Sequence, residues 1–333
     1  MKSTKVLVPS GVLGLGFDLK ALNSGIKKKP DIIAIDGGST DSGPYSLGSG
    51  SSKYSRAAVK AEWKTLMEAR EKANIPLIIG SSGTCGTDGM VDWMEEITIE
   101  VAKELDQNLK IAKLYCEQQK DYIKINYKNN KISPLKPAPY LDINLIDNMT
   151  HIVALAGAEQ IQKCLKTGAD IILAGRTTDT AIISALPLMQ GEDPGASWHG
   201  AKIAECGALC SSNPTSGVVL VEFDKIGFTV EAMSENAFCT PETVAAHMLY
   251  ENADPFILLL FCIVVVRNSR VDLYCSTCSI RNIISNVINI TNGSTNKLVL
   301  SYWLKLFVEL CKLDKEIIIW STILTSRVKV IKY

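Results

Sequence analysis

Short apolar segments alternate with longer polar and amphipathic segments, and this alternation constrains the fold more than any other feature of the chain. The segments expected to form strands are 5–8, 32–35, 76–80, 110–116 and 169–175, and the segment 151–155 could be another. Those expected to form helices are 54–74, 90–106, 158–168 (ended by Gly168) and a helix that begins after residue 175. Strands separated by helices in this way are typical of α/β proteins. We therefore predict an α/β fold with Rossmann-like layers, in which a mainly parallel sheet carries helices on both faces.

Glycine-rich polar loops follow four of these strands, at residues 11–16, 36–52, 80–89 and 175–179. In open parallel sheets, ligands bind beyond the carboxyl ends of the strands. Glycine lets backbone N–H groups approach a ligand, and hydroxyl groups add donors and acceptors. One such loop would be an ordinary turn, but four at one edge favour a binding site. The predicted substrate-binding residues are Gly37, Ser39, Thr40, Gly43, Gly80, Ser81, Gly83, Gly175, Arg176 and Asp179.

Asp36 and Asp41 lie five residues apart on one of these loops and are candidate catalytic residues. Paired carboxylates can hold a divalent cation or divide the roles of acid and base. They can equally cap the N–H groups of a turn or helix, and this alternative is strongest for Asp41, which precedes Ser-Gly-Pro. The sequence therefore identifies two candidate carboxylates and leaves the metal unknown.

Arg176 follows a predicted strand, and Asp179 lies three residues further on. A guanidinium at the start of a helix is well placed to bind a carboxylate or phosphate, although a structural ion pair with Asp179 is the alternative. The three histidines are isolated and lack metal-binding spacing, which favours structural roles. Among them, His199 is the candidate acid or base.

The sequence does not identify a cofactor. Gly11, Gly14 and Gly16 have the wrong order for the dinucleotide motif G-x-G-x-x-G, and "DGGST" resembles a sugar-kinase phosphate loop only weakly. Cys206 and Cys210 lack further zinc ligands, and Cys275 and Cys278 lie in an atypical region. Three further residues have open alternatives: Cys85 could be a nucleophile without an identified base, and Glu117 and Lys120 could line the sheet edge or start a solvated helix.

Composition indicates which compartment and which kinds of partner to expect for the protein. The formal net charge is zero, which gives no reason to expect binding to nucleic acid or to an anionic membrane. The ten cysteines are scattered, and the N-terminal apolar run is too short for a signal peptide. We therefore expect a cytoplasmic protein whose partner is a small molecule, with a homo-oligomer as a further expectation.

A change in composition after residue 255 predicts two regions. All 12 prolines and 22 of the 23 glycines precede it, and residues 256–333 contain no Ala, Pro, Gln, His or Met. Lys and Arg outnumber Asp and Glu there by 10 to 4. A globular segment of this length normally needs more turn and helix-end residues. We expect an α/β domain at 1–255, incomplete at its end, and an atypical tail at 256–333 of out-of-frame, intron or truncation origin.

Several long motifs resemble the acyclic terpene utilisation (AtuA-like) family over residues 4–255. They include "IDGGSTDSGPYSLGSG", "PLIIGSSG", "YCEQQKDYI", "AGRTTDTAIISALPLMQGEDPGASWHGAKIAECGA" and "TPETVAAHMLYENADP". The resemblance implies a cytosolic α/β protein associated with the breakdown of branched terpenoid acids as coenzyme A thioesters. It groups the loop residues from Asp36 to Gly43 in one motif and Gly175, Arg176 and Asp179 in another, without assigning their chemistry.

The expected function is that of an enzyme of small organic acid or acyl-CoA catabolism. The alternatives are a non-catalytic binding or assembly subunit of a carboxylase or hydratase system, and a non-functional truncated product. The chain departs from the family pattern after Pro255, where "FILLLFCIVVV" replaces a glycine- and proline-bearing segment. These 11 apolar residues are fewer than the roughly 20 that span a bilayer, so a membrane anchor is the less favoured alternative.

Overall fold

The computed structural model of the protein describes residues 3–38, 44–132, 141–251, 257–259, 262–267, 270–275 and 327–332. The strands are β1 (Thr4–Val8), β2 (Ile32–Asp36), β3 (Leu77–Gly80), β4 (Lys110–Tyr115), β5 (Ile171–Ala174), β6 (Val219–Phe223), β7 (Phe228–Ala232), β8 (Ile257–Leu259), β9 (Cys262–Arg267), β10 (Arg270–Cys275) and β11 (Arg327–Lys332). The α-helices are α1 (Leu19–Lys27), α2 (Tyr45–Ser49), α3 (Arg56–Ala73), α4 (Asp88–Leu105), α5 (Lys120–Lys128), α6 (Ile143–Asn148), α7 (Ala158–Leu165), α8 (Asp179–Gln190), α9 (Pro194–Ala204) and α10 (Pro241–Glu251). Two 3-10 helices are η1 (Gly207–Cys210) and η2 (Pro214–Ser216).

One large sheet organises the described part of the chain. Its strand order is β11-β4-β5-β3-β2-β1-β6-β7. The five strands β4, β5, β3, β2 and β1 are parallel, and β11, β6 and β7 pair antiparallel to their neighbours. The carboxyl ends of the five parallel strands therefore meet at one edge. This arrangement confirms the predicted α/β class.

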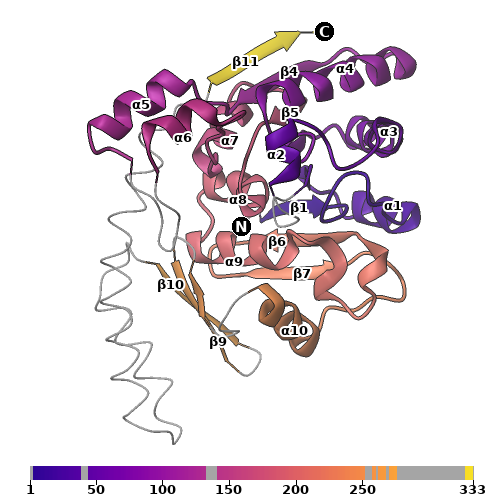
Figure 1. Cartoon of the computed structure of the whole chain (residues 1–333). Coiled ribbons are helices and arrows are strands. Elements are labelled where there is room, and N and C mark those ends of the chain that lie inside the picture. Colours follow the sequence, from indigo (N-terminus) through magenta and orange to yellow (C-terminus); the bar gives the residue numbers. More distant parts are fainter. Residues whose placement is uncertain are drawn as a thin grey trace, which may run out of the picture.

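Helices cover both faces of the sheet, as Figure 1 shows. Successive residues of a strand point to opposite faces. Val6 and Val8 of β1 accordingly pack in the core beneath α7, α8 and α9, whereas Leu7 packs beneath α1, α3 and α4. All three side chains are almost completely buried. The two apolar layers hold the strands rigidly and so fix the positions of the loops that leave their ends.

Hydroxyl side chains start the helices that follow three of these loops. Ser55, Thr87 and Thr178 each accept a hydrogen bond from a backbone N–H in the first turn of α3, α4 and α8. Such caps satisfy N–H groups that have no partner within the helix. They therefore fix the residue at which each loop ends.

The expected strand at 151–155 is wrong. Within this segment Val153 forms an isolated bridge with Glu117, and Ala156, just after it, forms another with Thr177. The segment cannot pair along β4 because β5 and β11 occupy both sides of that strand. It lies instead beyond the ends of β4 and β5. The helix predicted at 158–168 ends at Leu165, and Gly168 forms the following turn.

The region after residue 255 contributes four described strands. A three-stranded antiparallel sheet has the order β10-β9-β8, and β11 pairs with β4 along its full length. The boundary at residue 255 stays a prediction, and 276–326 lies outside the described residues. Within the described part of the chain, no helix combines the length and apolar character that crossing a membrane requires.

Candidate functional site

Asp36 lies at the carboxyl end of β2 and is only 3% exposed. Its Oδ2 accepts a hydrogen bond from the Gly38 N–H (2.8 Å), and its Oδ1 has no hydrogen-bond partner within the described ranges. Burial raises the pKa of Asp36 well above its ordinary value, and the negative charge of Asp179 raises it further. The Gly38 N–H, Arg176 and Ser81 lower this pKa but do not cancel the increase. The buried carboxyl therefore keeps its proton to a higher pH than an exposed aspartate.

Arg176 connects three loops at this edge. It follows β5, and its Nη1 donates to the carbonyl oxygen of Gly38 (3.0 Å), to Ser81 Oγ (3.1 Å) and to the carbonyl oxygen of Thr84 (3.4 Å). The loops after β2, β3 and β5 thus meet around one guanidinium. We define the Asp36 centre as Asp36, Ser81, Arg176 and Asp179, four residues that the sequence had identified.

Three predicted glycines allow these loops to pack closely. A Cβ at Gly37 would lie 2.5 Å from the Ser81 carbonyl oxygen, and one at Gly80 would lie 2.4 Å from Thr177 Oγ1. A Cβ at Gly175 would lie 2.9 Å from the carbonyl oxygen of Gly86. The closest atoms are thus parts of neighbouring loops. A ligand-binding role for these glycines stays a prediction.

The structure describes only some of the remaining predicted loop residues. Ser39, Thr40, Asp41 and Gly43 lie outside the described residues, so the pairing of Asp41 with Asp36 stays a prediction. Gly83 lies against α4, where an added Cβ would be 2.5 Å from Met90 Sδ.

Sequence reasoning missed two threonines of this edge. Thr84 has a positive φ of 71°, which is strained for a branched residue, and its hydroxyl donates to the Gly37 carbonyl oxygen (3.2 Å). Thr177 is buried, and its Oγ1 has no hydrogen-bond partner among the described residues. Their position within glycine-rich loops was the available signal. Both hydroxyls lie beside the Asp36 centre.

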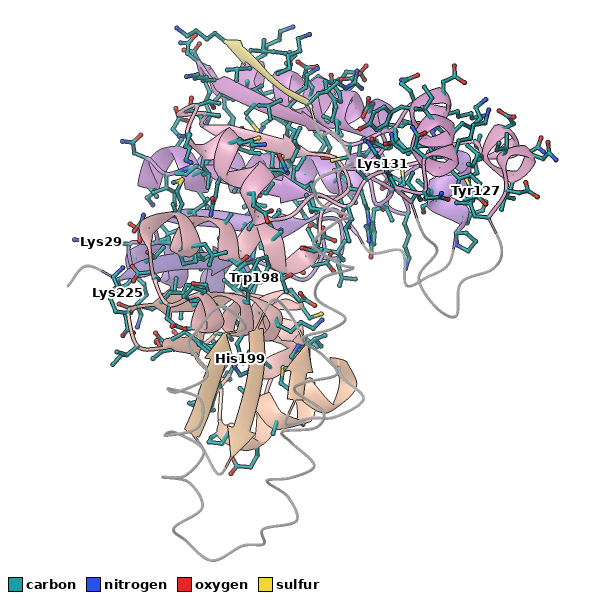
Figure 2. The ribbon with its side chains drawn as sticks, turned by 90° about the vertical axis from the view of Figure 1, so that its left-hand side faces the viewer. Lys29, Tyr127, Lys131, Trp198, His199 and Lys225 are labelled. Carbon is teal, nitrogen blue, oxygen red and sulfur yellow. The ribbon has the colours of Figure 1, made fainter. Side chains whose placement is uncertain are left out.

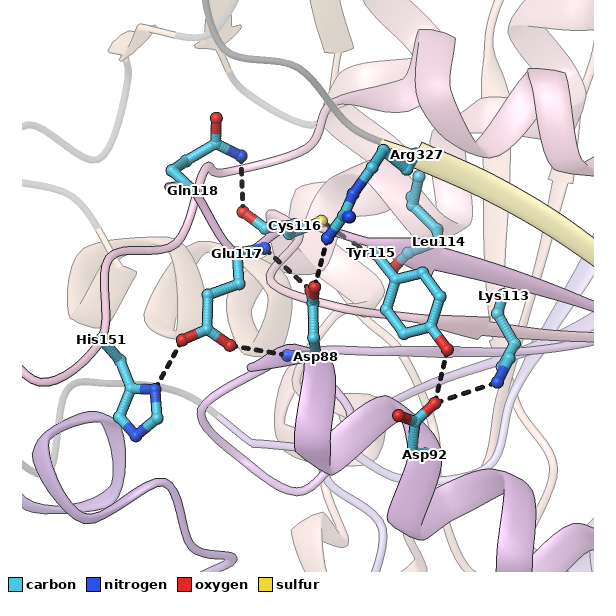
Figure 3. Close-up of polar contacts among 10 residues, drawn as sticks. All are labelled: Asp88, Asp92, Lys113, Leu114, Tyr115, Cys116, Glu117, Gln118, His151 and Arg327. Atoms are coloured by element: carbon cyan, nitrogen blue, oxygen red, sulfur yellow. Dashed lines mark hydrogen bonds and ion pairs between the residues drawn. The ribbon is translucent and has the colours of Figure 1, made fainter. Parts of the chain in front are cut away.

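A second polar cluster lies at the end of β4, and Figure 3 shows its contacts. His151 Nδ1 lies 2.6 Å from Glu117 Oε1. Glu117 Oε2 accepts from the Asp88 backbone N–H (3.1 Å), and the Glu117 N–H donates to Asp88 Oδ1 (3.0 Å). We name His151, Glu117 and Asp88 the Glu117 cluster. The sequence suggested Glu117 through its place after a strand, but treated His151 as structural.

Two members of the Glu117 cluster, Asp88 and Glu117, line a polar cavity of about 540 Å³. Lys120 and Lys124 of α5 contribute to its wall, and the remaining lining residues are Gln118, Gln119, Asp121, Asp147, Thr150 and Ile152. Lys124 is already paired with Asp121 and Asp147. On its other side, Asp88 pairs with Arg327 of β11 at 2.5 Å. The cavity is therefore walled by groups of both charges.

His199 lies apart from both clusters. It is fully buried on α9, with its ring edge-on to Phe228 of β7 at a centroid distance of 5.2 Å. Figure 2 shows His199 in the lower part of the molecule, away from Tyr127 and Lys131 at the upper right. Since β7 lies three strand positions from β2, about 14 Å separate these strands. Burial lowers the pKa of His199 to about 4.

The described cysteines do not form a metal site. Within the described residues, no group of three or more His, Cys, Asp or Glu side chains is arranged to hold a metal ion. The thiol of Cys210 lies 4.0 Å from that of Cys239, and Cys206 precedes η1. Cys85 is buried, with its thiol 3.5 Å from Thr87 Oγ1. Cys278 lies outside the described residues.

Comparison with known proteins places the chain in a family. The family model described as "Acyclic terpene utilisation family protein AtuA" matches residues 42–292, about three quarters of the chain. The match includes the loops after β3 and β5 and runs past residue 255. No curated protein and no solved structure matched the chain. The agreement of this match with the α/β fold shows that the chain belongs to the acyclic terpene utilisation family AtuA.

Proposed function

We propose that the protein is an enzyme that acts on a small branched organic acid or its coenzyme A thioester at the Asp36 centre. The observation that carries this proposal is the buried Asp36 carboxyl, whose Oδ1 has no hydrogen-bond partner among the described residues. A carboxyl group that keeps its proton can donate a hydrogen bond to a carbonyl oxygen as negative charge develops on it. Asp36 would act as this donor.

Arg176 supports the proposal through its charge and its contacts. Its Nη1 holds Gly38, Ser81 and Thr84 in place, so the guanidinium organises the loops around Asp36. A positive charge at this edge also favours a substrate carboxylate or a thioester oxygen. Arg176 would therefore position the centre and attract the substrate. Family membership supports the link to acyclic terpenes, and the thioester form of the substrate is our proposal.

The first experiment measures binding and turnover with the same compounds. Isothermal titration calorimetry would compare branched acids, their coenzyme A thioesters and free coenzyme A, and mass spectrometry would follow conversion. The expected result is binding of the acid or thioester, no comparable binding of coenzyme A alone, and a loss of turnover of about 100-fold or more in Asp36→Asn. Asp106→Asn, at the exposed end of α4, is the matched control.

Each other outcome has a defined meaning. Binding without turnover would replace the proposal with a non-catalytic binding or assembly role. Turnover that Asp36→Asn leaves intact would remove Asp36 from the chemistry. Failure of the wild-type protein to bind any acid or thioester would refute the proposed function.

A further inference from the structure

We infer that Cys210 and Cys239 form a site of reversible oxidation, at which a peroxide converts the two thiols into a disulfide that fastens the start of α10 to η1. This inference goes beyond the proposed function, because neither cysteine belongs to the Asp36 centre. Three observations on the described residues support it.

The first observation is the contact between the two thiols. Cys210 is the last residue of η1, Cys239 lies two residues before α10, and both are free thiols. Their sulfur atoms are 4.0 Å apart, which leaves no room for another atom between them. Each sulfur moves by rotation about a single side-chain bond, so small rotations bring the two sulfurs to bonding distance. The fold therefore presents a pair of thiols that can link without a large rearrangement.

The second observation is that hydrogen bonds fix the backbone beside both cysteines. The Ser212 N–H donates to the Phe238 carbonyl oxygen (2.9 Å), and the Phe238 N–H donates to Ser212 Oγ (3.0 Å). On the other side of Cys239, the Thr240 N–H donates to Thr243 Oγ1 (2.9 Å) in the first turn of α10. Contacts other than the thiols therefore hold the two segments together, and they keep the sulfurs adjacent in the reduced protein.

The third observation is that Cys239 differs from the fully buried thiols in exposure and acidity. Cys116 and Cys164 are 0% exposed, and burial raises the pKa of each to about 12. Cys239 is only partly buried, and a hydrogen bond from the Cys210 thiol lowers its pKa. The thiolate is the form of cysteine that attacks an oxidant. Cys239 is therefore the thiol that reacts first, and the buried Cys210 is positioned to form the disulfide with it.

The proposed reaction transfers two electrons to the peroxide. The Cys239 thiolate attacks one oxygen of hydrogen peroxide, the O–O bond breaks, and the released hydroxide takes a proton to become water. Cys239 is then a sulfenic acid. The Cys210 sulfur attacks the Cys239 sulfur, the S–O bond breaks, and the hydroxide leaves as a second water with the proton of the Cys210 thiol. Two thiols and one peroxide thus yield one disulfide and two waters, and an added dithiol reverses the link.

The test maps disulfides in the full-length protein after exposure to hydrogen peroxide. The reduced protein is treated with peroxide at neutral pH, the remaining thiols are blocked with N-ethylmaleimide, and the chain is cleaved after glutamate. Cys239 then lies alone in the peptide 236–242, and Cys206 and Cys210 share the peptide 206–222. Mass spectrometry should detect these two peptides linked to each other, and dithiothreitol should separate them.

Three variants assign the link to its cysteines. Cys206→Ser is the matched control, because Cys206 is partly exposed and lies four residues before Cys210. This variant should keep the link, whereas Cys210→Ser and Cys239→Ser should each lose it. Loss of the link in Cys206→Ser would overturn the inference. Wild-type protein in which peroxide leaves Cys239 unlinked would also overturn it, and this result decides the question even where a variant fails to fold.

Thermal unfolding of the same samples is the second readout. The disulfide closes a loop of about 30 residues that contains β6 and β7, and such a loop restricts the unfolded chain. The oxidised wild type should therefore unfold about 5 °C or more above the reduced protein, and Cys239→Ser should show no such difference. An oxidised midpoint equal to or below the reduced one would show that the link does not fit the folded chain, which would overturn the inference.

Discussion

Gly86 provides the sharpest test of how the loops are held together at the sheet edge. It has a φ of +64°, and a Cβ added there would lie 2.3 Å from the backbone nitrogen of Arg176 and 2.6 Å from its Cα. The left-handed conformation costs alanine about 1–2 kcal/mol. Overlap with backbone atoms that cannot rotate away adds about 1–3 kcal/mol. Gly86→Ala should therefore lower the free energy of unfolding by about 2–5 kcal/mol, a large share of the 5–15 kcal/mol typical of a folded domain.

Urea unfolding monitored by tryptophan fluorescence would measure this loss, and two further variants separate its causes. Gly16→Ala has a comparable strain, with φ of +99°, but no atom within 4 Å of the added Cβ. Gly89→Ala, within α4, has neither strain nor overlap and should be neutral or slightly stabilising. Equal losses in Gly86→Ala and Gly16→Ala would refute the claim that close packing against Arg176 matters.

Three further predictions concern charge. Because burial raises the pKa of Asp36 above 3.8, the folded protein holds a proton that the unfolded chain releases, and the free energy of unfolding falls as pH rises above about 4. In urea titrations across that range, the stability of Asp36→Asn should therefore rise relative to that of the wild type by up to about 1.4 kcal/mol per pH unit. Burial lowers the pKa of His199 from 6.5 to about 4, so acidification between these values should cost the wild type up to about 3 kcal/mol, and His199→Gln should lack this pH dependence. Arg327→Ala removes an exposed ion pair with Asp88 and should lower the free energy of unfolding by less than about 1 kcal/mol, measured by thermal unfolding at low salt. A larger loss of stability, or an equal loss in Lys329→Ala, would contradict the assignment of this loss to a weak ion pair.

The sequence predicted those parts of the fold that local patterns determine. The buried strands are short apolar runs, and capping residues such as Ser55 and Thr87 mark where α3 and α4 begin. The segment 151–155 has the same apolar character, but pairing depends on which strand edges are open. β11 closes the edge of β4 from a position about 200 residues further along the chain. No local pattern indicates that contact, so the assignment of 151–155 as a strand was wrong.

The candidate site likewise contains residues that the sequence could identify and residues that it could not. Asp36, Ser81 and Arg176 were identifiable because each follows a strand of one parallel sheet, and the topology brings such residues to one edge. Glu117 and His151 are 34 residues apart and meet only because an irregular segment lies beyond the ends of β4 and β5. Rules based on residue spacing predict contacts within helices, strands and compact metal motifs. They do not predict a contact between two residues that an irregular segment brings together.

The environment of the Asp36 carboxyl group provides the strongest physical argument for acid–base chemistry at this sheet edge. Asp36 is buried and accepts one backbone N–H, so desolvation favours its protonated form. Glu117 is partly exposed, and its carboxyl oxygens lie within hydrogen-bond distance of the Asp88 N–H and of His151 Nδ1. A carboxyl group that burial keeps protonated is typical of enzymes that donate a proton or hydrogen bond to a developing negative charge. An isosteric amide at Asp36 cannot release or regain that proton, so Asp36→Asn should lose turnover while substrate binding survives.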